Sequence, residues 1–524
     1  MSTQTEVSHR ATLVNGESSE LVKGLGLTSA TTIVMGSMIG SGIFIVSADI
    51  ARLVNSPALL ILAWVITGFM TVTGALAYGE LAAMMPKAGG QYVYLREALG
   101  PLWGFLYGWT MFLVIQTGTI AAVGVAFGKF LGVFFPSVSA SNWIWHIGHV
   151  PAWKLGPMLL GNMDVGLNTQ NFWGIVTIVF LTVLNIFGIK TGATVQNIFT
   201  FAKTAALLGL VLFGLALGRN AQAISENFGH FWQNASFSAL HAVQVGVGGP
   251  IAFVGFFTIL AVAQVGSLFS ADAWNNVTFT AGEVQNPRRN LPISLALGTG
   301  TVILLYIAAN FVYLLVLPLH GDPSGAAVLS RGIQYATDDR VGTAVMQSIF
   351  GPMGASLMAI AILLSTFGCN NGLILAGARI YYAMARDGLF FRSVGKLQPR
   401  YKTPAVSLIL QTIWTCFLCL SGSYGQLLDL TMFAVIIFYI LTIAGLFVLR
   451  YKRPDVERPY KAFGYPVLPA AYILMALFIE IVLLRYKPQF TWPGLIIVLL
   501  GIPVYLFWSR SAQGPASELH GEAG

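Results

Sequence analysis

Long apolar stretches recur along almost the whole chain, and most are close to the length that crosses a bilayer. They begin at Leu27 and continue nearly to the end of the 524-residue sequence. A helix of about 20 predominantly apolar residues spans roughly 30 Å of hydrocarbon. Only 9% of the residues are charged, whereas a soluble domain carries roughly 25%. We therefore predict an all-α, polytopic membrane protein, because so few charges cannot cover a water-facing surface.

The apolar stretches predict about twelve spans. We place them at 27–50, 57–85, 101–135, 169–188, 191–218, 251–281, 292–317, 353–384, 404–421, 426–449, 466–485 and 491–508. Five of them begin near a proline, where a missing N–H group costs least; these are Pro57, Pro101, Pro292, Pro404 and Pro466.

Basic residues concentrate in loops on the side of the N-terminus, which is why the net charge of +8 does not indicate a nucleic-acid partner. The positive-inside rule then places both termini in the cytoplasm. The first twenty-odd residues are polar and contain no apolar h-region, so we expect no removable signal peptide. The densest clusters are Arg379, Arg386, Arg392, Lys396, Arg400 and Lys402, followed by Arg450, Lys452, Arg453, Arg458 and Lys461.

Two spans carry signs of a helix break. The first contains three glycines and two serines between Gly36 and Gly42, and the sixth contains Ser270 and the acid Asp272. Unwound backbone at membrane depth survives only where it is buried or lines a cavity. Interrupted segments at equivalent places of a five-plus-five arrangement indicate the binding site of an inverted-repeat transporter. The alternative is that Gly36 and Gly40 only permit close helix packing.

The sequence contains no motif typical of a disulfide-rich protein, a metal site or a soluble enzyme. The three cysteines, Cys369, Cys416 and Cys419, all lie in apolar runs, so no disulfide framework is indicated. The histidines have no companions at metal-ligand spacing, and no phosphate-binding loop or nucleophile elbow occurs. We predict no enzyme activity, no cofactor and no metal, and a channel is disfavoured because no filter or pore-lining repeat is present.

At this point the residues resemble a family, the amino acid–polyamine–organocation superfamily, and most closely its L-type amino acid transporter branch. The similarity covers about residues 22–450. It is carried by Met35 to Phe44, Tyr78 to Leu81, Pro86 to Tyr92, Phe269 to Asn275, Glu283 to Pro287, Gly368 to Gly372 and Arg379 to Gly388.

The resemblance implies a ten-helix inverted-repeat core with two further helices, and substrate bound between the unwound parts of helices one and six. Ser41 and Gly42 would offer N–H groups to the substrate carboxylate, and nearby carbonyl groups would face its ammonium. Phe269 would be the gate. The implied binding residues are Met38, Ile39, Gly40, Ser41, Gly42, Phe269, Ser270 and Asp272. The implied parts are a cytoplasmic tail (1–24), the core (25–450, with repeats at about 25–218 and 251–450), two appended helices (451–508) and a second cytoplasmic tail (509–524).

Lys203 is a charge in the middle of a span, and such residues usually face the protein interior and mark function. Gln196, Thr200 and Lys203 share one helical face. The resemblance implies that Lys203 occupies the ion position of sodium-coupled relatives and bridges helices one and eight, which argues against sodium coupling. It either carries a transported proton or is a fixed cation. Asn370 either helps to bind it or bridges helices.

Asp272 departs from the resembled branch, in which many members have glycine. Its carboxylate can cap the half-helix that begins near Trp274, contact the substrate, or carry a proton. We predict a sodium-independent transporter of amino acids, small or neutral zwitterionic, working by alternating access as an exchanger or proton symporter in the plasma or inner membrane. The alternatives are a carrier of cationic amino acids or polyamines and a transporter-derived nutrient sensor. The loop from Pro136 to Asn168 contains no cysteine, so we expect no disulfide-linked heavy chain of the kind found in animal L-type relatives.

Overall fold

Helices make up most of the computed structural model, which describes residues 21, 23–151, 153–155, 158–160, 163–232, 241–244, 251–420 and 424–513. Within these residues, ten helices are long and apolar enough to cross a membrane, and two shorter apolar ones, Phe256–Ser270 and Ala405–Cys419, bring the set to twelve. The expected all-α membrane protein with about twelve spans is confirmed. The tails expected at 1–24 and 509–524 fall largely outside the described residues.

The spans are formed by α2 (Leu27–Met38) with the turn η1 (Gly42–Phe44), α4 (Pro57–Met84), α6 (Pro101–Thr110) continued by η2 (Met111–Ile115) and α7 (Gln116–Leu131), α8 (Thr169–Ile186), α9 (Ile189–Leu217), α11 (Phe256–Ser270), α13 (Pro287–Val316), α15 (Val341–Arg386), α16 (Ala405–Cys419), α17 (Tyr424–Lys452), α18 (Val467–Tyr486) and α19 (Pro488–Gln513). Shorter elements connect them: α3 (Val46–Val54), α5 (Gln91–Leu99), α10 (Ala221–Gly229), α12 (Asn276–Phe279), α14 (Val328–Arg331), η3 (Ala281–Glu283), η4 (Thr337–Asp339) and η5 (Arg392–Gly395). The strands form antiparallel pairs in loops: β1 (Trp143–Val150) with β4 (Met163–Asn168), β2 (Trp153–Leu155) with β3 (Met158–Leu160), and β5 (His241–Gln244) with β6 (Ile251–Val254).

Proline positions agree with the sequence in part. Pro57 and Pro101 occupy the start of α4 and α6 as expected. However, α13 begins at Pro287, so Pro292 lies inside that helix rather than at its start. The helix expected from residue 353 begins earlier, at Val341, and bends at Gly351, whose φ of 64° lies in the left-handed region that glycine tolerates. Both helices therefore begin before the proline that lies near their expected start.

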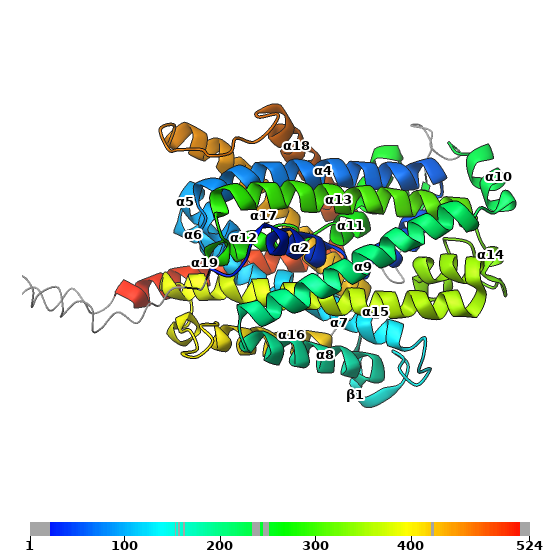
Figure 1. Cartoon of the computed structure of the whole chain (residues 1–524), viewed down its shortest axis with the longest axis horizontal. Helices are drawn as coiled ribbons and strands as arrows, with labels where there is room; N and C mark the ends of the chain where they lie inside the picture. The colour runs from blue at the N-terminus through cyan, green and yellow to red at the C-terminus, as the bar shows by residue number, and fades with distance from the viewer. Residues whose placement is uncertain are drawn as a thin grey trace, which may run out of the picture.

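The first span lies within the bundle. Figure 1 shows α2 near the middle of the molecule, with α9 crossing close to it and α4 and α13 running along one side. α2 contacts α9, α13 and α15, and α11 contacts α3 and α4. Both interrupted helices are thus surrounded by continuous ones, which shields their unwound backbone from lipid as membrane structure requires.

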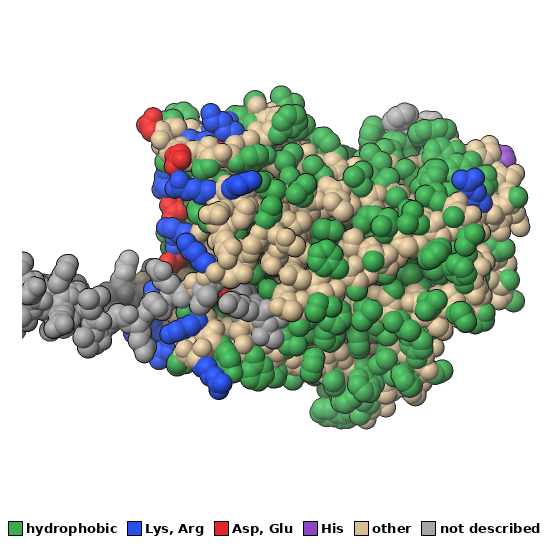
Figure 2. All heavy atoms as spheres, in the orientation of Figure 1, with side chains coloured by type: hydrophobic (Ala, Val, Ile, Leu, Met, Phe, Trp, Pro, Cys, Tyr) green, Lys and Arg blue, Asp and Glu red, His purple; other side chains and the backbone are tan. Residues whose placement is uncertain are grey.

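One end of the bundle, which we name the basic end, collects most of the exposed positive side chains. Figure 2 shows the Lys and Arg side chains gathered at the left of the molecule, with hydrophobic side chains over much of the remaining surface. Ion pairs tie its loops together: Arg288 with Glu457, Arg453 with Glu97, and Arg96 with Asp387. The exposed cations of this end include Lys87, Arg288, Arg289, Arg386, Arg392, Lys396, Arg400, Lys452, Arg453 and Lys461.

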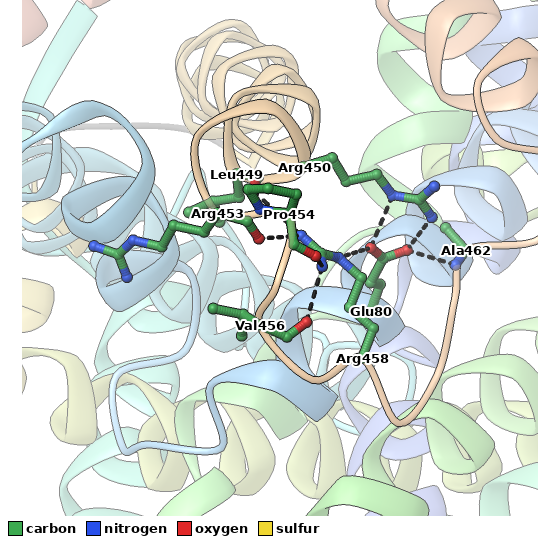
Figure 3. A network of polar contacts seen from close by, with 8 residues as sticks. All are labelled: Glu80, Leu449, Arg450, Arg453, Pro454, Val456, Arg458 and Ala462. Carbon is green, nitrogen blue, oxygen red and sulfur yellow. Dashed lines mark hydrogen bonds and ion pairs between the residues drawn. The ribbon is translucent and has the colours of Figure 1, made fainter.

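Glu80 anchors the loop that follows α17 at the basic end (Figure 3). Its carboxylate is fully buried and accepts hydrogen bonds from Arg450 Nε at 2.9 Å and Nη2 at 2.6 Å. The N–H group of Ala462 donates to the same carboxylate at 2.7 Å, and Arg458 approaches it at 3.3 Å. Arg458 also donates to backbone carbonyls of the loop, among them Val456 O at 2.8 Å. The contacts are those of a structural anchor that joins α4 to the end of α17 and to the loop between α17 and α18.

Candidate substrate site

The two interrupted spans meet at their breaks. α2 ends at Met38 and the chain resumes as η1 at Gly42, while α11 ends at Ser270 and α12 starts at Asn276. The hydroxyl group of Tyr306, on α13, donates to Met38 O at 2.9 Å and to Ser270 O at 3.2 Å. One phenol therefore joins the last carbonyl groups of both half-helices.

The spacing of glycines in the first span follows from close contacts. A Cβ atom at Gly42 would lie 2.9 Å from Ser270 Cα, and one at Gly36 would lie 1.9 Å from Gln196 Nε2. Neither position can hold a larger residue without moving its neighbour. The glycine at 42 thus lets the first break approach the second, and the glycine at 36 lets α2 pack against α9. The packing interpretation and the broken-helix interpretation therefore both apply.

Backbone polar groups of the first break are largely engaged by side chains from other helices. Ser365, on α15, donates through its hydroxyl to Ile39 O and Gly40 O, both at 3.0 Å. The turn η1 begins with bonds from Phe44 N–H to Ser41 O and from Ile45 N–H to Gly42 O.

Lys203 ties α9 to both α2 and α15. Its ammonium donates to Gly36 O at 2.5 Å, to Ile39 O at 2.8 Å and to Ser365 O at 3.4 Å, and the side chain is 1% exposed. All three acceptors are neutral carbonyl groups, which are also the ligands that a bound cation would use. The structure thus places Lys203 where the resemblance expected it, between the first and eighth spans.

Asn370 lies away from Lys203. Its amide faces α7. With the amide oriented so that both groups are satisfied, its nitrogen donates to Ile120 O and its oxygen accepts from Gly124 N–H, each at 3.2 Å. Its neighbour Asn371 donates to Gly192 O at 3.1 Å. Of the two roles weighed for Asn370, these contacts are those of a bridge between helices, and the bonds described for Lys203 go to carbonyl groups instead.

Asp272 lies in the second break, in a strained segment. The following residue, Ala273, has a φ of 63°, a region that non-glycine residues seldom adopt and that often marks functional sites. The Asp272 carboxylate accepts a hydrogen bond of 2.5 Å from the Tyr439 hydroxyl group on α17. The N-cap position of α12 is held by Asn275, without a side-chain cap bond. Asp272 is thus not at the N-cap, because the chain turns once more before α12 begins.

A buried cavity opens beside Asp272. It is lined by residues of α5, of α6 to α7, of the second break and α12, of α15 and of α17. The polar lining residues are Gln91, Tyr107, Gln116, Thr119, Asp272, Asn275, Asn276 and Tyr439. Phe269 lies in the last turn of α11 and is 8% exposed. Its assignment as a gate stays a prediction.

Several of these residues escaped the sequence analysis. Tyr306, Asn310 and Tyr313 were missed, although they recur at i, i+4 and i+7 within an apolar run and so share one face of α13. Asn310 accepts from Ser47 at 2.7 Å, and Tyr313 donates to Ile43 O at 3.2 Å. That polar face was the available signal. Tyr439 had no comparable local signal, because its partner Asp272 is far away in sequence.

Two adjoining helix breaks inside a twelve-helix membrane bundle, with a buried lysine bound to one of them, define a membrane transporter of the broken-helix type. The amino acid permease family matches residues 25–507, and the chain belongs to this family. The resemblance found in the sequence is confirmed. Membership of a transporter family also agrees with the prediction that the chain is not an enzyme.

The chain is similar over nearly its whole length to curated transporters. It is 27% identical to the serine/threonine exchanger SteT of Bacillus subtilis, over 93% of this chain and 97% of that protein. It is 28% identical to the human large neutral amino acids transporter small subunit 2, over 94% of this chain and 82% of that one. It is 27% identical to the human b(0,+)-type amino acid transporter 1, over 94% and 88% respectively. These similarities support amino acid transport as the general activity.

Proposed function

We propose that the chain carries small or neutral zwitterionic amino acids across a cell membrane without sodium. The observation that carries the proposal is the contact between the two breaks, at Gly42 and Ser270. The breaks expose backbone donors and acceptors inside the bilayer. N–H groups near Ser41 and Gly42 bind the carboxylate of the cargo, with help from the positive end of the following helix. Carbonyl groups near Met38, Ile39, Phe269 and Asp272 face the ammonium, since a carbonyl oxygen has two lone pairs.

The names of the relatives support this cargo class. One relative exchanges serine and threonine, and another transports large neutral amino acids. By alternating access, Phe269 closes over the bound cargo, and transport proceeds either as exchange or with a proton. The ten-helix core is residues 25–450, and the two helices within 451–508 are appended to it.

Sodium independence is supported by Lys203. Its ammonium already donates to the carbonyl oxygens of Gly36 and Ile39, so a sodium ion bound there would meet an existing positive charge. The ammonium acts as a fixed substitute for the ion, or as a site from which a proton is carried.

The basic end is the cytoplasmic end in this proposal. The excess of Lys and Arg in its loops is the feature that sets orientation under the positive-inside rule. Both termini then lie in the cytoplasm, and the membrane is a plasma or inner membrane. We also propose that the protein works without a disulfide-linked heavy chain.

A second candidate function, transport of cationic amino acids or polyamines, is favoured by one observation. Asp272 lines the cavity, and among the salt bridges of the described residues none involves this carboxylate. A positively charged cargo would supply the missing countercharge.

Reconstitution of the purified protein in liposomes tests both candidates. Uptake of a panel of labelled amino acids is measured with and without internal substrate, with and without a pH gradient, and with sodium replaced by choline. We expect uptake to be unchanged in choline, and strong sodium dependence would contradict the Lys203 assignment. Putrescine, which lacks the carboxylate, should compete more than tenfold less well than amino acids, because a buried donor site is left unpaired. Equal competition by putrescine would favour the polyamine candidate.

A further inference from the structure

The cavity beside Asp272 contains polar groups of two kinds, those already bonded within the protein and those left over. Gln91 donates to Phe438 O at 3.1 Å and to Thr442 at 3.0 Å, and it accepts from Asn275 at 2.8 Å. Gln116 donates to Leu373 O at 2.7 Å. The amide nitrogens of Gln91 and Gln116 therefore join the helices that form the walls of the cavity.

Two side chains of the cavity wall have unused polar atoms. Among the described residues, the hydroxyl group of Tyr107 and the amide nitrogen of Asn276 have no hydrogen-bond partner. Asn276 is 1% exposed and Tyr107 is 2% exposed. A buried polar group without a partner costs free energy and needs an explanation, such as a ligand that completes it.

Asp272 adds an acceptor to the same cavity. Its one hydrogen bond to a side chain comes from the neutral hydroxyl of Tyr439. The cavity thus presents a carboxylate that accepts, an amide nitrogen that donates and a phenol that can do either. These three groups come from the second break, from α12 and from α6, so they converge from separate elements.

We propose that this cavity binds the side chain of the cargo and selects neutral polar side chains, namely carboxamides and hydroxyls. The inference rests on the proposed function, since it assumes that an amino acid is held at the adjoining breaks. A carboxamide matches the groups on the wall because its NH₂ donates to Asp272 while its carbonyl oxygen accepts from Asn276. A hydroxyl group, although smaller, can also donate to Asp272 and accept from Asn276.

Other side chains complete this cavity less well. An aliphatic side chain would leave Tyr107 and Asn276 unpaired, and sites built around buried polar groups discriminate strongly against analogues that lack the partner. An ammonium group would suit Asp272, but it carries only donors and would face the donor nitrogen of Asn276. The neutral polar class is thus the one that pairs with both Asp272 and Asn276.

The test uses asparagine and leucine as a matched pair, because their side chains have the same number of heavy atoms and similar branching. Inhibition of uptake is measured in liposomes, with the fastest labelled amino acid of the panel as tracer. We expect asparagine to inhibit at a concentration at least tenfold lower than leucine. Ornithine should inhibit less well than asparagine. Equal inhibition by leucine and asparagine, or stronger inhibition by ornithine, would overturn the inference.

Variants connect this preference to the cavity. Asn276→Leu should reduce the asparagine preference to less than threefold, and Tyr107→Phe should weaken it. Tyr94→Phe is the matched control, because Tyr94 is also a fully buried tyrosine but lies outside the set of residues that line the cavity. The Tyr94→Phe variant should keep the wild-type preference for asparagine over leucine. An unaltered preference in Asn276→Leu would contradict the assignment.

Two further outcomes keep the inference separate from the proposed function. If no amino acid is taken up or competes, the proposed function fails. If amino acids are transported with a flat side-chain profile, only the side-chain inference fails. Should Asn276→Leu not fold, stabilisation of the purified wild-type protein against heat by asparagine and by leucine gives the same comparison, and equal stabilisation overturns the inference.

Discussion

The carboxylate of Glu283 and the guanidinium of Arg379 form a two-point ion pair in which both hydrogen bonds measure 3.1 Å. Each side chain is only 1% exposed. Arg379 also donates to Leu375 O at 2.7 Å, and Glu283 O accepts from the N–H groups of Gly24 and Leu25, both at 3.0 Å. The pair joins the segment after the second break to α15 and to the N-terminal segment. It therefore fastens these three segments to one another.

Breaking this pair on one side should be strongly destabilising. Arg379→Met leaves the Glu283 carboxylate buried without its partner, and removing one member of a buried pair costs about 3–5 kcal/mol. We expect a marked fall in the midpoint of thermal unfolding, followed by intrinsic fluorescence of the purified protein. The double change Glu283→Gln with Arg379→Met should recover much of the loss.

Arg288 provides the matched control for that experiment. It pairs with Glu457 at 2.8 Å, but the two side chains are 59% and 72% exposed, and exposed pairs contribute about 0–1 kcal/mol. Arg288→Met should thus leave the midpoint nearly unchanged. A similar effect of Arg288→Met and Arg379→Met would show that the buried pair contributes no more stability than the exposed one.

The Glu80 anchor predicts that lysine cannot replace Arg450. The guanidinium makes two bonds to Glu80 and lies 3.6 Å from the centre of the Tyr465 ring. A lysine ammonium can neither reproduce the paired bonds nor stack flat on the ring. We expect Arg450→Lys to lower the unfolding free energy by roughly 1–3 kcal/mol, since hydrogen bonds to charged groups contribute about that much. Arg453→Lys, at an exposed position, is the control, and equal losses in both variants would contradict the anchor.

Lys203 should be needed for the folded first break. Lys203→Met keeps most of the apolar stem but removes the bonds to Gly36 O and Ile39 O, and charge-assisted bonds contribute about 1.5–3 kcal/mol each. We expect reduced thermal stability together with reduced uptake. Thr204→Val at the adjacent position is the control, because the Thr204 hydroxyl has no partner among the described residues. If Lys203→Met were as stable as the wild type, a structural role for the ammonium would be excluded.

The breaks and Lys203 were predictable because their signals are local. Glycine and serine at mid-membrane depth disfavour a continuous helix, and a charge in an apolar run must face the protein interior. Each signal is contained within a few consecutive residues, so one sequence suffices to detect it.

The hydrogen-bond partners of the breaks were harder to predict from the sequence, because they come from distant spans. The Tyr306 hydroxyl reaches Met38 across 268 positions, and the Tyr439 hydroxyl reaches Asp272 across 167. No local periodicity reports such pairs. Of the three roles left open for Asp272, the helix cap is not seen for a related reason. Asn275 holds the N-cap of α12 because the positive φ of Ala273 adds a turn before α12, and single-sequence propensity does not predict a strained alanine.

The last prediction concerns Asp272, where the sequence departs most from its resembled branch. If its carboxylate bonds to the cargo, Asp272→Gly should weaken cargo binding while the purified protein stays monodisperse. A hydrogen bond to a charged group contributes about 1.5–3 kcal/mol, which corresponds to roughly ten- to a hundredfold in affinity. The dissociation constant is measured on purified protein by isothermal titration.

The choice of variants separates the possible roles of Asp272. Tyr439→Phe removes the phenol that holds the carboxylate but keeps the acid, so affinity should fall less than in Asp272→Gly. Asp272→Asn keeps the shape, and loss of pH-driven uptake with preserved exchange in this variant would assign a proton to the site. If the affinity of Asp272→Gly for the cargo were within threefold of wild type, a contact between the carboxylate and the cargo would be excluded. The carboxylate would then serve only to hold the second break against α17 through Tyr439.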